Sequence, residues 1–205
     1  MGKVFIAFAL LLSYGLNSVV YSFVNPVFPL LAHSRNVPPF IQSLFFTLFA
    51  LPQLFVFSYL PSIERKCGVK TTYLLHLALG AFSVSLLSFL YFIHSPLLFS
   101  IWSLGFRFLN GFADAAIVYQ YRPLAKRLLP SHFTLFNELS VATVALSSGI
   151  GPLLAAQVSA HYGFHITCFI VAGFALLVAI NLSCALSSSS CEPKNPRQDV
   201  NELHI

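Results

Sequence analysis

Two charged residues interrupt an apolar stretch of the sequence, "SLGFRFLNGFADAAIVY" at residues 103–119. An arginine at the centre of a membrane helix costs about 2.5 to 3.5 kcal/mol, so Arg107 needs a partner or a function there. Asp114 follows seven residues later, which is close to two helical turns and about 10 Å along a helix axis. Both charges are therefore expected on one face, with Asn110 and Gly111 on the turn between them.

A third charged residue lies at a similar depth in the next apolar run. Glu138 is about five residues inside that run, and a short loop joins it to the run that carries Arg107 and Asp114. We therefore expect the three side chains to form a polar cluster between neighbouring helices. An arginine between two carboxylates leaves one net negative charge, which attracts a proton or a cation. The alternative is a structural ion pair that locks the two helices together.

The composition identifies the elements that must hold these charges. Of the 205 residues, 57% are hydrophobic and 8% are charged, whereas soluble domains carry about 25% charged residues. Polar residues gather between long apolar runs, which favours membrane-spanning helices over a barrel. We predict an all-α, polytopic membrane protein with a six-helix domain at 1–186 and a polar cytoplasmic tail at 187–205. The six spans are expected at about 4–24, 40–60, 72–93, 97–121, 133–158 and 164–186.

The basic residues predict the orientation, because Lys and Arg in short loops are retained on the cytoplasmic side. A six-crossing path places only Arg35 on one side. The residues on the other side are Lys3, Arg65, Lys66, Lys70, Arg122, Lys126, Arg127, Lys194 and Arg197. Both termini are therefore expected in the cytoplasm, and the type of membrane stays open. The net charge of +5 reflects this topology, so we expect the lipid bilayer as a partner and no nucleic acid.

Small residues in the fifth predicted span suggest close packing or a hinge. The stretch "ALSSGIGPLLAA" contains Gly149, Gly151 and Pro152. Glycine allows helices to approach closely, and proline removes a backbone hydrogen bond and bends a helix. Packing and gating are both open as roles for these residues and for Gly111.

Other motifs with known chemistry are missing from the sequence. It contains no Walker loop, GxSxG, HExxH or dinucleotide fingerprint, so we expect no enzyme of these types and no cofactor. The four cysteines form no CxxC pair, and we expect neither a metal site nor a disulfide framework.

The order of these features resembles the N-terminal half of a major facilitator superfamily transporter. The resemblance rests on an Arg-x-x-x-Gly at Arg107, a Gly-x-Gly-Pro ending at Pro152 and a basic loop between the second and third spans. The stretches "RFLNGFADA" and "HYGFHITCFIVAG", with Glu138 ahead of the Gly-Pro motif, look most like the vesicular amine transporter and drug:proton antiporter branch. The resemblance extends to about residue 186.

The loop between the second and third spans departs from the family pattern. The stretch "PSIERKCGVK" keeps Gly68 and Lys70, but Arg65 stands where the family has aspartate, with Glu64 carrying an acid one position earlier. The Gly-Gly that usually follows the Gly-Pro motif is Ala155–Ala156.

The resemblance implies a small-molecule or ionic substrate, moved by alternating access between two six-helix halves. In one interpretation the chain is a half-transporter that pairs with itself or with a separate half. The candidates for coupling protons or binding a cationic substrate are then Arg107, Asp114, Glu138 and Asn110. In a second, it is a truncated, non-transporting protein that binds or regulates a full-length transporter. In a third, the chain is an incomplete part of a twelve-helix transporter.

Overall fold

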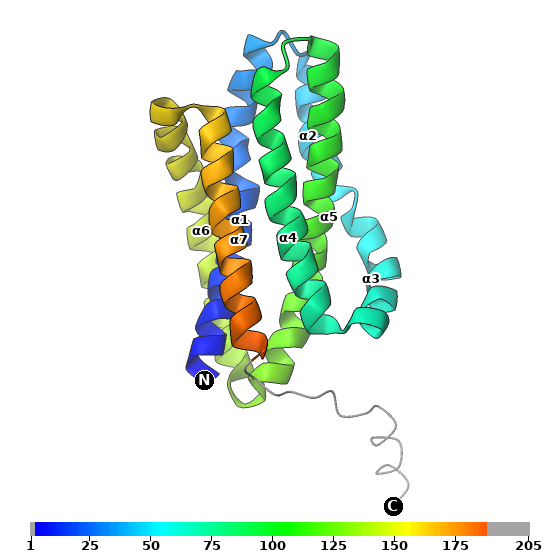
Figure 1. The fold of residues 1–205 in the computed structure, drawn as a ribbon, viewed down its shortest axis with the longest axis vertical. Helices are drawn as coiled ribbons and strands as arrows, with labels where there is room; N and C mark the ends of the chain where they lie inside the picture. Colours follow the sequence, from blue (N-terminus) through cyan, green and yellow to red (C-terminus); the bar gives the residue numbers. More distant parts are fainter. Residues whose placement is uncertain (1–2, 188–205) are drawn as a thin grey trace, which may run out of the picture.

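The computed structural model describes residues 3–187 and folds them into helices. Figure 1 shows long helices standing side by side, with no strand in the described range. The elements are, in chain order, α1 (Lys3–Ser34), α2 (Pro39–Ala50), α3 (Gln53–Cys67), α4 (Val69–Ser88), η1 (Phe89–Phe92), α5 (Pro96–Leu128), η2 (Pro130–His132), α6 (Phe133–Tyr162) and α7 (Phe164–Ser187). The all-α prediction is confirmed. The predicted tail lies outside the described residues beyond Ser187.

Five segments of the described chain are long and apolar enough to cross a membrane, judged by length and composition. They are Val4–Ser34, Pro39–Cys67, Val69–Phe92, Pro130–Tyr162 and Phe164–Leu186. These segments correspond to five of the six predicted spans. The remaining predicted span, 97–121, lies within α5, which is 33 residues long but more polar. At 1.5 Å per residue α5 measures about 50 Å, which exceeds the hydrocarbon core of about 30 Å.

The second predicted span, 40–60, is not one continuous helix. The structure interrupts it at Leu51 and Pro52, between the end of α2 and the start of α3. Pro52 has no backbone N–H, and its ring collides with the carbonyl group four residues earlier, so an α-helix cannot continue through it undisturbed. The break divides the predicted span into two helices of different direction (Figure 1), although Pro39–Cys67 as a whole remains one of the segments apolar enough to cross a membrane.

The first span, predicted at 4–24, is also longer than expected, because α1 continues to Ser34 through Pro26 and Pro29. It ends where Asn36 adopts a positive φ of 56°. The backbone N–H groups of Asn36 and Val37 then bond back to His33 and Ala32, which satisfies the last carbonyls of the helix.

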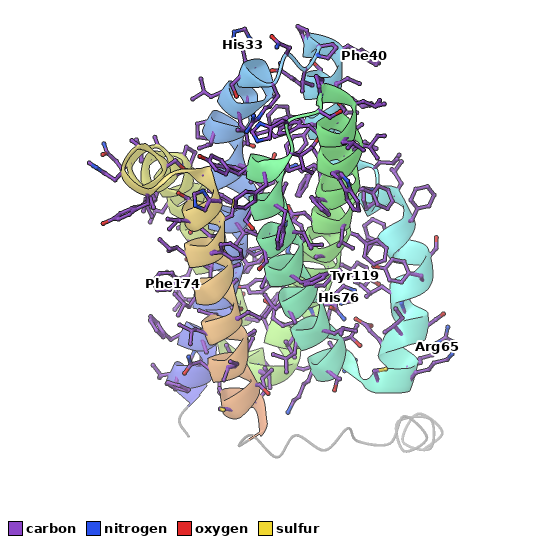
Figure 2. All side chains as sticks on the ribbon, turned by 45° about the horizontal axis from the view of Figure 1, so that its top comes forward. His33, Phe40, Arg65, His76, Tyr119 and Phe174 are labelled. Atoms are coloured by element: carbon purple, nitrogen blue, oxygen red, sulfur yellow. The ribbon has the colours of Figure 1, made fainter. Side chains whose placement is uncertain are left out.

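The helix order produces two distinct ends of the bundle. One end holds the start of α1 and the turns that join α3 to α4 and α5 to α6 (Figure 1). Arg65 lies at this end, whereas His33 and Phe40 lie at the other (Figure 2). Six residues of the larger predicted basic group lie in the helix turns at this first end, which we call the basic end; they are Arg65, Lys66, Lys70, Arg122, Lys126 and Arg127. Arg35 lies at the opposite end, as the six-crossing path requires.

Close packing of α1 against α6 depends on two glycines. A methyl group on Gly15 would lie 2.6 Å from Thr143 Cγ2, and one on Gly151 would collide with Ser22 Oγ. Gly151 therefore allows α1 to lie close to α6, while its role in packing or gating stays a prediction. A methyl group on Gly149 would meet nothing within 4 Å in the described chain. Pro152 lies inside α6, which continues through it, and its gating role stays a prediction.

A polar layer crosses the bundle between two apolar clusters. The cluster toward the basic end includes Leu10 and Ile117, and the cluster toward the other end includes Val24 and Phe99. Between them along α1 and α5 lie the polar side chains Ser13, Asn17, Arg107, Asn110 and Asp114, while Ser22 and Ser83 lie at the near edge of the second cluster. The apolar clusters shield this layer along the helix axes, so the fold places its polar groups where the bundle can protect them.

Candidate functional site

Arg107 is fully buried in the middle of α5, with 0% of its surface exposed. Three aromatic rings surround its guanidinium carbon, at centroid distances of 4.3 Å for Phe49, 5.0 Å for Phe45 and 5.3 Å for Tyr21. The face of an aromatic ring attracts a cation by about 0.5 to 2 kcal/mol. Rings from α1 and α2 therefore surround the charge for which the sequence predicts a carboxylate partner.

Asn110 accepts the one hydrogen bond that Arg107 makes within the described chain. Arg107 Nη1 donates to Asn110 Oδ1 over 3.4 Å, and Asn110 Nδ2 donates to Ser83 Oγ over 3.1 Å. Ser83 Oγ donates in turn to the carbonyl of Gly80 over 2.7 Å. This series of bonds connects α5 to α4. Arg107 Nε is buried and has no hydrogen-bond partner.

Asp114 accepts a hydrogen bond from a residue of α1. Asn17 Nδ2 donates a hydrogen bond to Asp114 Oδ1 over 2.6 Å, across a sequence separation of 97 residues. Asn17 was not predicted as a site residue. Its only signal in the sequence is that it is an amide within an apolar run, and that signal does not identify its partner.

The predicted cluster of Arg107, Asp114 and Glu138 does not form. No ion pair joins these three residues in the part of the chain that the structure describes, and Glu138 is exposed on α6. A short loop does connect α5 to α6, but α6 packs chiefly against α1. The close approach at Gly15 and Gly151 holds α6 on α1, which turns Glu138 away from the charges on α5.

Gly111 lets α2 approach the site. A methyl group on Gly111 would overlap the carbonyl oxygen of Phe49 and lie 2.9 Å from its carbonyl carbon. Phe49 also places its ring nearest the guanidinium of Arg107. The glycine therefore permits the helix contact that brings this ring over the charge, while its role in packing or gating stays a prediction.

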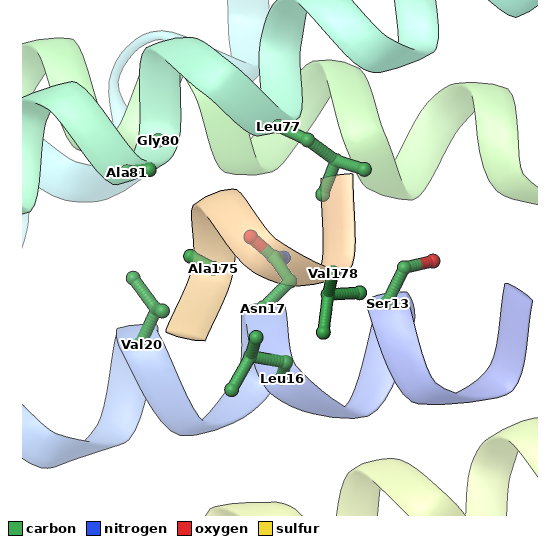
Figure 3. A pocket seen from close by; sticks show the side chains of 9 residues that line it. All are labelled: Ser13, Leu16, Asn17, Val20, Leu77, Gly80, Ala81, Ala175 and Val178. Carbon is green, nitrogen blue, oxygen red and sulfur yellow. The ribbon is translucent and has the colours of Figure 1, made fainter. Parts of the chain in front are cut away.

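A small cavity of about 10 Å³ lies beside Asn17. Figure 3 shows it between α1, α4 and α7, with Ser13 and Asn17 among the mostly apolar lining residues. This volume holds about one water molecule. The side-chain oxygens of Ser13 and Tyr73 are 3.0 Å apart nearby. The cavity can therefore hydrate the polar layer but is too small for an organic solute.

The loop motif at the basic end has its own partners. Gln120 Nε2 donates to Glu64 Oε1 over 3.1 Å, which connects α3 to α5. Gly68 has a φ of 80°, a conformation that favours glycine, and it joins α3 directly to α4. Lys70 Nζ donates to the carbonyl of Leu186 over 3.1 Å, while Arg65 is exposed. Glu64 thus provides an acid that contacts the neighbouring helix.

Two comparisons with known proteins bear on these observations. The sequence profile of the Major Facilitator Superfamily matches residues 10–202, which is most of the chain. A search of curated protein sequences finds no significant match.

Proposed function

Because the chain belongs to the major facilitator superfamily, a family of membrane transporters, we propose that it moves a small solute by alternating access coupled to protons. The observation that carries the proposal is the polar layer inside an integral, multi-pass membrane protein. Arg107 is fully buried there, and Asp114 accepts a hydrogen bond from another helix. Ionisable groups inside a membrane bundle mark substrate and proton pathways.

Asp114 is the proposed proton carrier. A carboxyl group removed from water gives up its charge when it takes a proton, and this lowers the cost of its burial. The bond from Asn17 holds the group in place in either state, because Oδ1 can accept a hydrogen bond with or without the added proton. Glu138 is not part of this proposal, because it is exposed on another helix. The proton-coupled antiporter branch suggested by the sequence supports the same role.

Uptake into vesicles tests the function. Purified protein is reconstituted into liposomes, and uptake of a panel of labelled small organic cations, anions and zwitterions is measured with a pH gradient of either direction. We expect a solute to accumulate above its level in protein-free vesicles, and a protonophore to remove the accumulation. Accumulation that is unchanged by the protonophore would contradict coupling to protons.

We further propose that this six-helix unit works against a second one. The exposed face of α6 supports a second unit, since it carries Glu138 together with exposed apolar side chains such as Leu146 and Leu153. A second copy of the chain or a separate six-helix chain can cover this face. Light scattering in mild detergent distinguishes them, because a self-paired unit has twice the mass of one chain. A strict monomer that still transports would contradict the need for a second unit.

We also propose that the basic end faces the cytoplasm, because Lys and Arg residues close to the ends of membrane helices are retained on that side. Cys67 is exposed at this end. We expect a membrane-impermeant thiol reagent to label Cys67 only after the cells are permeabilised, with a Cys67→Ser variant as the control for other thiols. Equal labelling of intact cells would contradict this orientation.

A further inference from the structure

We propose that Arg107 binds a carboxylate group of the transported solute, which makes the solute a small organic anion or zwitterion. The inference rests on the transport function proposed above and names its substrate class. It depends on three features of Arg107: unused hydrogen-bond donors, the lack of an ion-paired carboxylate in the described chain, and a cage of three aromatic rings of which one is partly exposed.

The guanidinium group of Arg107 has N–H donors that form no hydrogen bond within the described chain. A guanidinium carries five N–H bonds. Only one hydrogen bond is formed within the described chain, to Asn110 Oδ1 at a long 3.4 Å, and Nε is buried without a partner. A buried donor without an acceptor carries a desolvation cost that an acceptor would remove. A carboxylate can accept two parallel N–H bonds from one guanidinium, which suits this arginine.

No carboxylate of the described chain forms an ion pair with Arg107, although Asp114 interacts with it electrostatically from further along the same helix. Residues 3–187 contain three acidic residues. Asp114 accepts its hydrogen bond from Asn17, although it shares the face of α5. Glu64 lies at the basic end of the bundle, and Glu138 is exposed on α6. The hydrogen-bond donors of Arg107 are therefore not taken up by a carboxylate of the described chain.

The aromatic cage around Arg107 holds the charge without using its donors. Ring faces attract the cation electrostatically, but they are poor hydrogen-bond acceptors compared with oxygen. Two of the rings are buried, with Phe45 at 0% and Phe49 at 6% exposure, while Tyr21 is 38% exposed. Tyr21 lies against Phe49 at a centroid distance of 4.5 Å. Tyr21 is thus the most exposed of the three rings, and the rings favour an apolar or aromatic group next to the carboxylate of the ligand.

Three probes of similar shape test the charge of the ligand. The purified protein in mild detergent is heated with benzoate, benzamide or benzylammonium at constant ionic strength and pH 7, and the unfolding temperature is measured against probe concentration. A ligand that binds the folded state raises this temperature with its concentration. We expect benzoate to do so and the neutral and cationic probes to have little effect. Equal shifts for benzoate and benzamide, or a shift with benzylammonium alone, would overturn the proposal without the use of any variant.

Variants then assign the effect to Arg107. We expect Arg107→Gln to weaken benzoate binding by at least about tenfold, the lower range for a hydrogen bond to a charged group. Arg107→Lys should bind benzoate with intermediate affinity, because lysine keeps the positive charge but lacks the planar guanidinium group that donates two parallel hydrogen bonds. Arg122→Gln is the matched control, since Arg122 is an exposed arginine of the same helix and should bind benzoate as the wild type does. Unchanged benzoate binding by a folded Arg107→Gln variant, checked by gel filtration, would contradict the assignment.

The binding assay separates this inference from the transport function. If the protein accumulates cations in a proton-dependent way but does not bind benzoate, the anion site is contradicted and the proposed transport function is supported. If the protein binds benzoate through Arg107 but transports no member of the anion panel, the anion site is supported and its role in transport is contradicted.

Discussion

Replacing Asp114 with asparagine is expected to reduce proton-linked uptake to the level of protein-free vesicles. Asparagine has the shape of aspartate, and its side-chain oxygen can still accept the hydrogen bond that Asn17 donates over 2.6 Å. It cannot take up a proton in the relevant pH range. The variant should therefore fold and bind solute, yet show no accumulation driven by a pH gradient.

The control for this experiment is Glu138→Gln, the same change of carboxylate to amide on a different helix. Glu138 is exposed and makes no ion pair with Arg107 or Asp114 in the described chain, so its variant should retain gradient-driven uptake. If the Asp114 variant accumulates solute as the wild type does, Asp114 is structural. Loss of coupling only in the Glu138 variant would move the proton site to α6.

Gly111→Ala should destabilise the protein by about 2 kcal/mol or more, in the upper part of the range for overpacked sites. The added methyl group would overlap the carbonyl oxygen of Phe49 and lie 2.9 Å from its carbonyl carbon and 3.0 Å from its Cα. These are backbone atoms, so α2 as a whole must move away from α5. Alanine favours a helix over glycine by only about 1 kcal/mol, which does not offset the collision. The displaced Phe49 ring should also weaken binding at Arg107.

Gly105→Ala provides the matched control, because Gly105 lies in the same helix and a methyl group there would meet nothing within 4 Å. Its expected effect is neutral or slightly stabilising, since alanine favours the helix. Unfolding temperature in detergent and SDS-induced unfolding compare the two variants. Equal stability of Gly105→Ala and Gly111→Ala would show that the contact with Phe49 is not needed.

The membrane-helix architecture was predictable from the sequence because it depends on local composition. Long apolar runs and short polar breaks identified helices in the right order, and basic residues such as Arg65 and Arg122 fell at one end. Helix limits were less predictable. The first span was expected to end at about residue 24, but α1 continues through Pro26 and Pro29, whereas Pro52 interrupts a predicted span. Proline restricts the backbone in each case, and packing of the surrounding chain decides how the helix responds.

The site was predictable only in part, because partners on different helices depend on packing. Arg107 and Asp114 were identified as site residues because they are charged residues within an apolar helix, but the side chains that contact them come from α1 and α2. Phe49 is one of many phenylalanines in the sequence, so nothing in its local context marks it as a wall of the cage. Glu138 was expected beside α5 because a short loop joins α5 to α6. In the structure α6 instead packs chiefly against α1, through the contacts at Gly15 and Gly151.

The most direct measurement of the central claim is the movement of protons when a transported solute is added to reconstituted vesicles. The vesicles contain a pH-sensitive dye and no initial pH gradient, and solute is supplied on one side only. We predict an immediate change of internal pH with the wild-type protein, its absence in Asp114→Asn, and its retention in Glu138→Gln. Solute uptake by the wild-type protein with no change of internal pH would contradict the account.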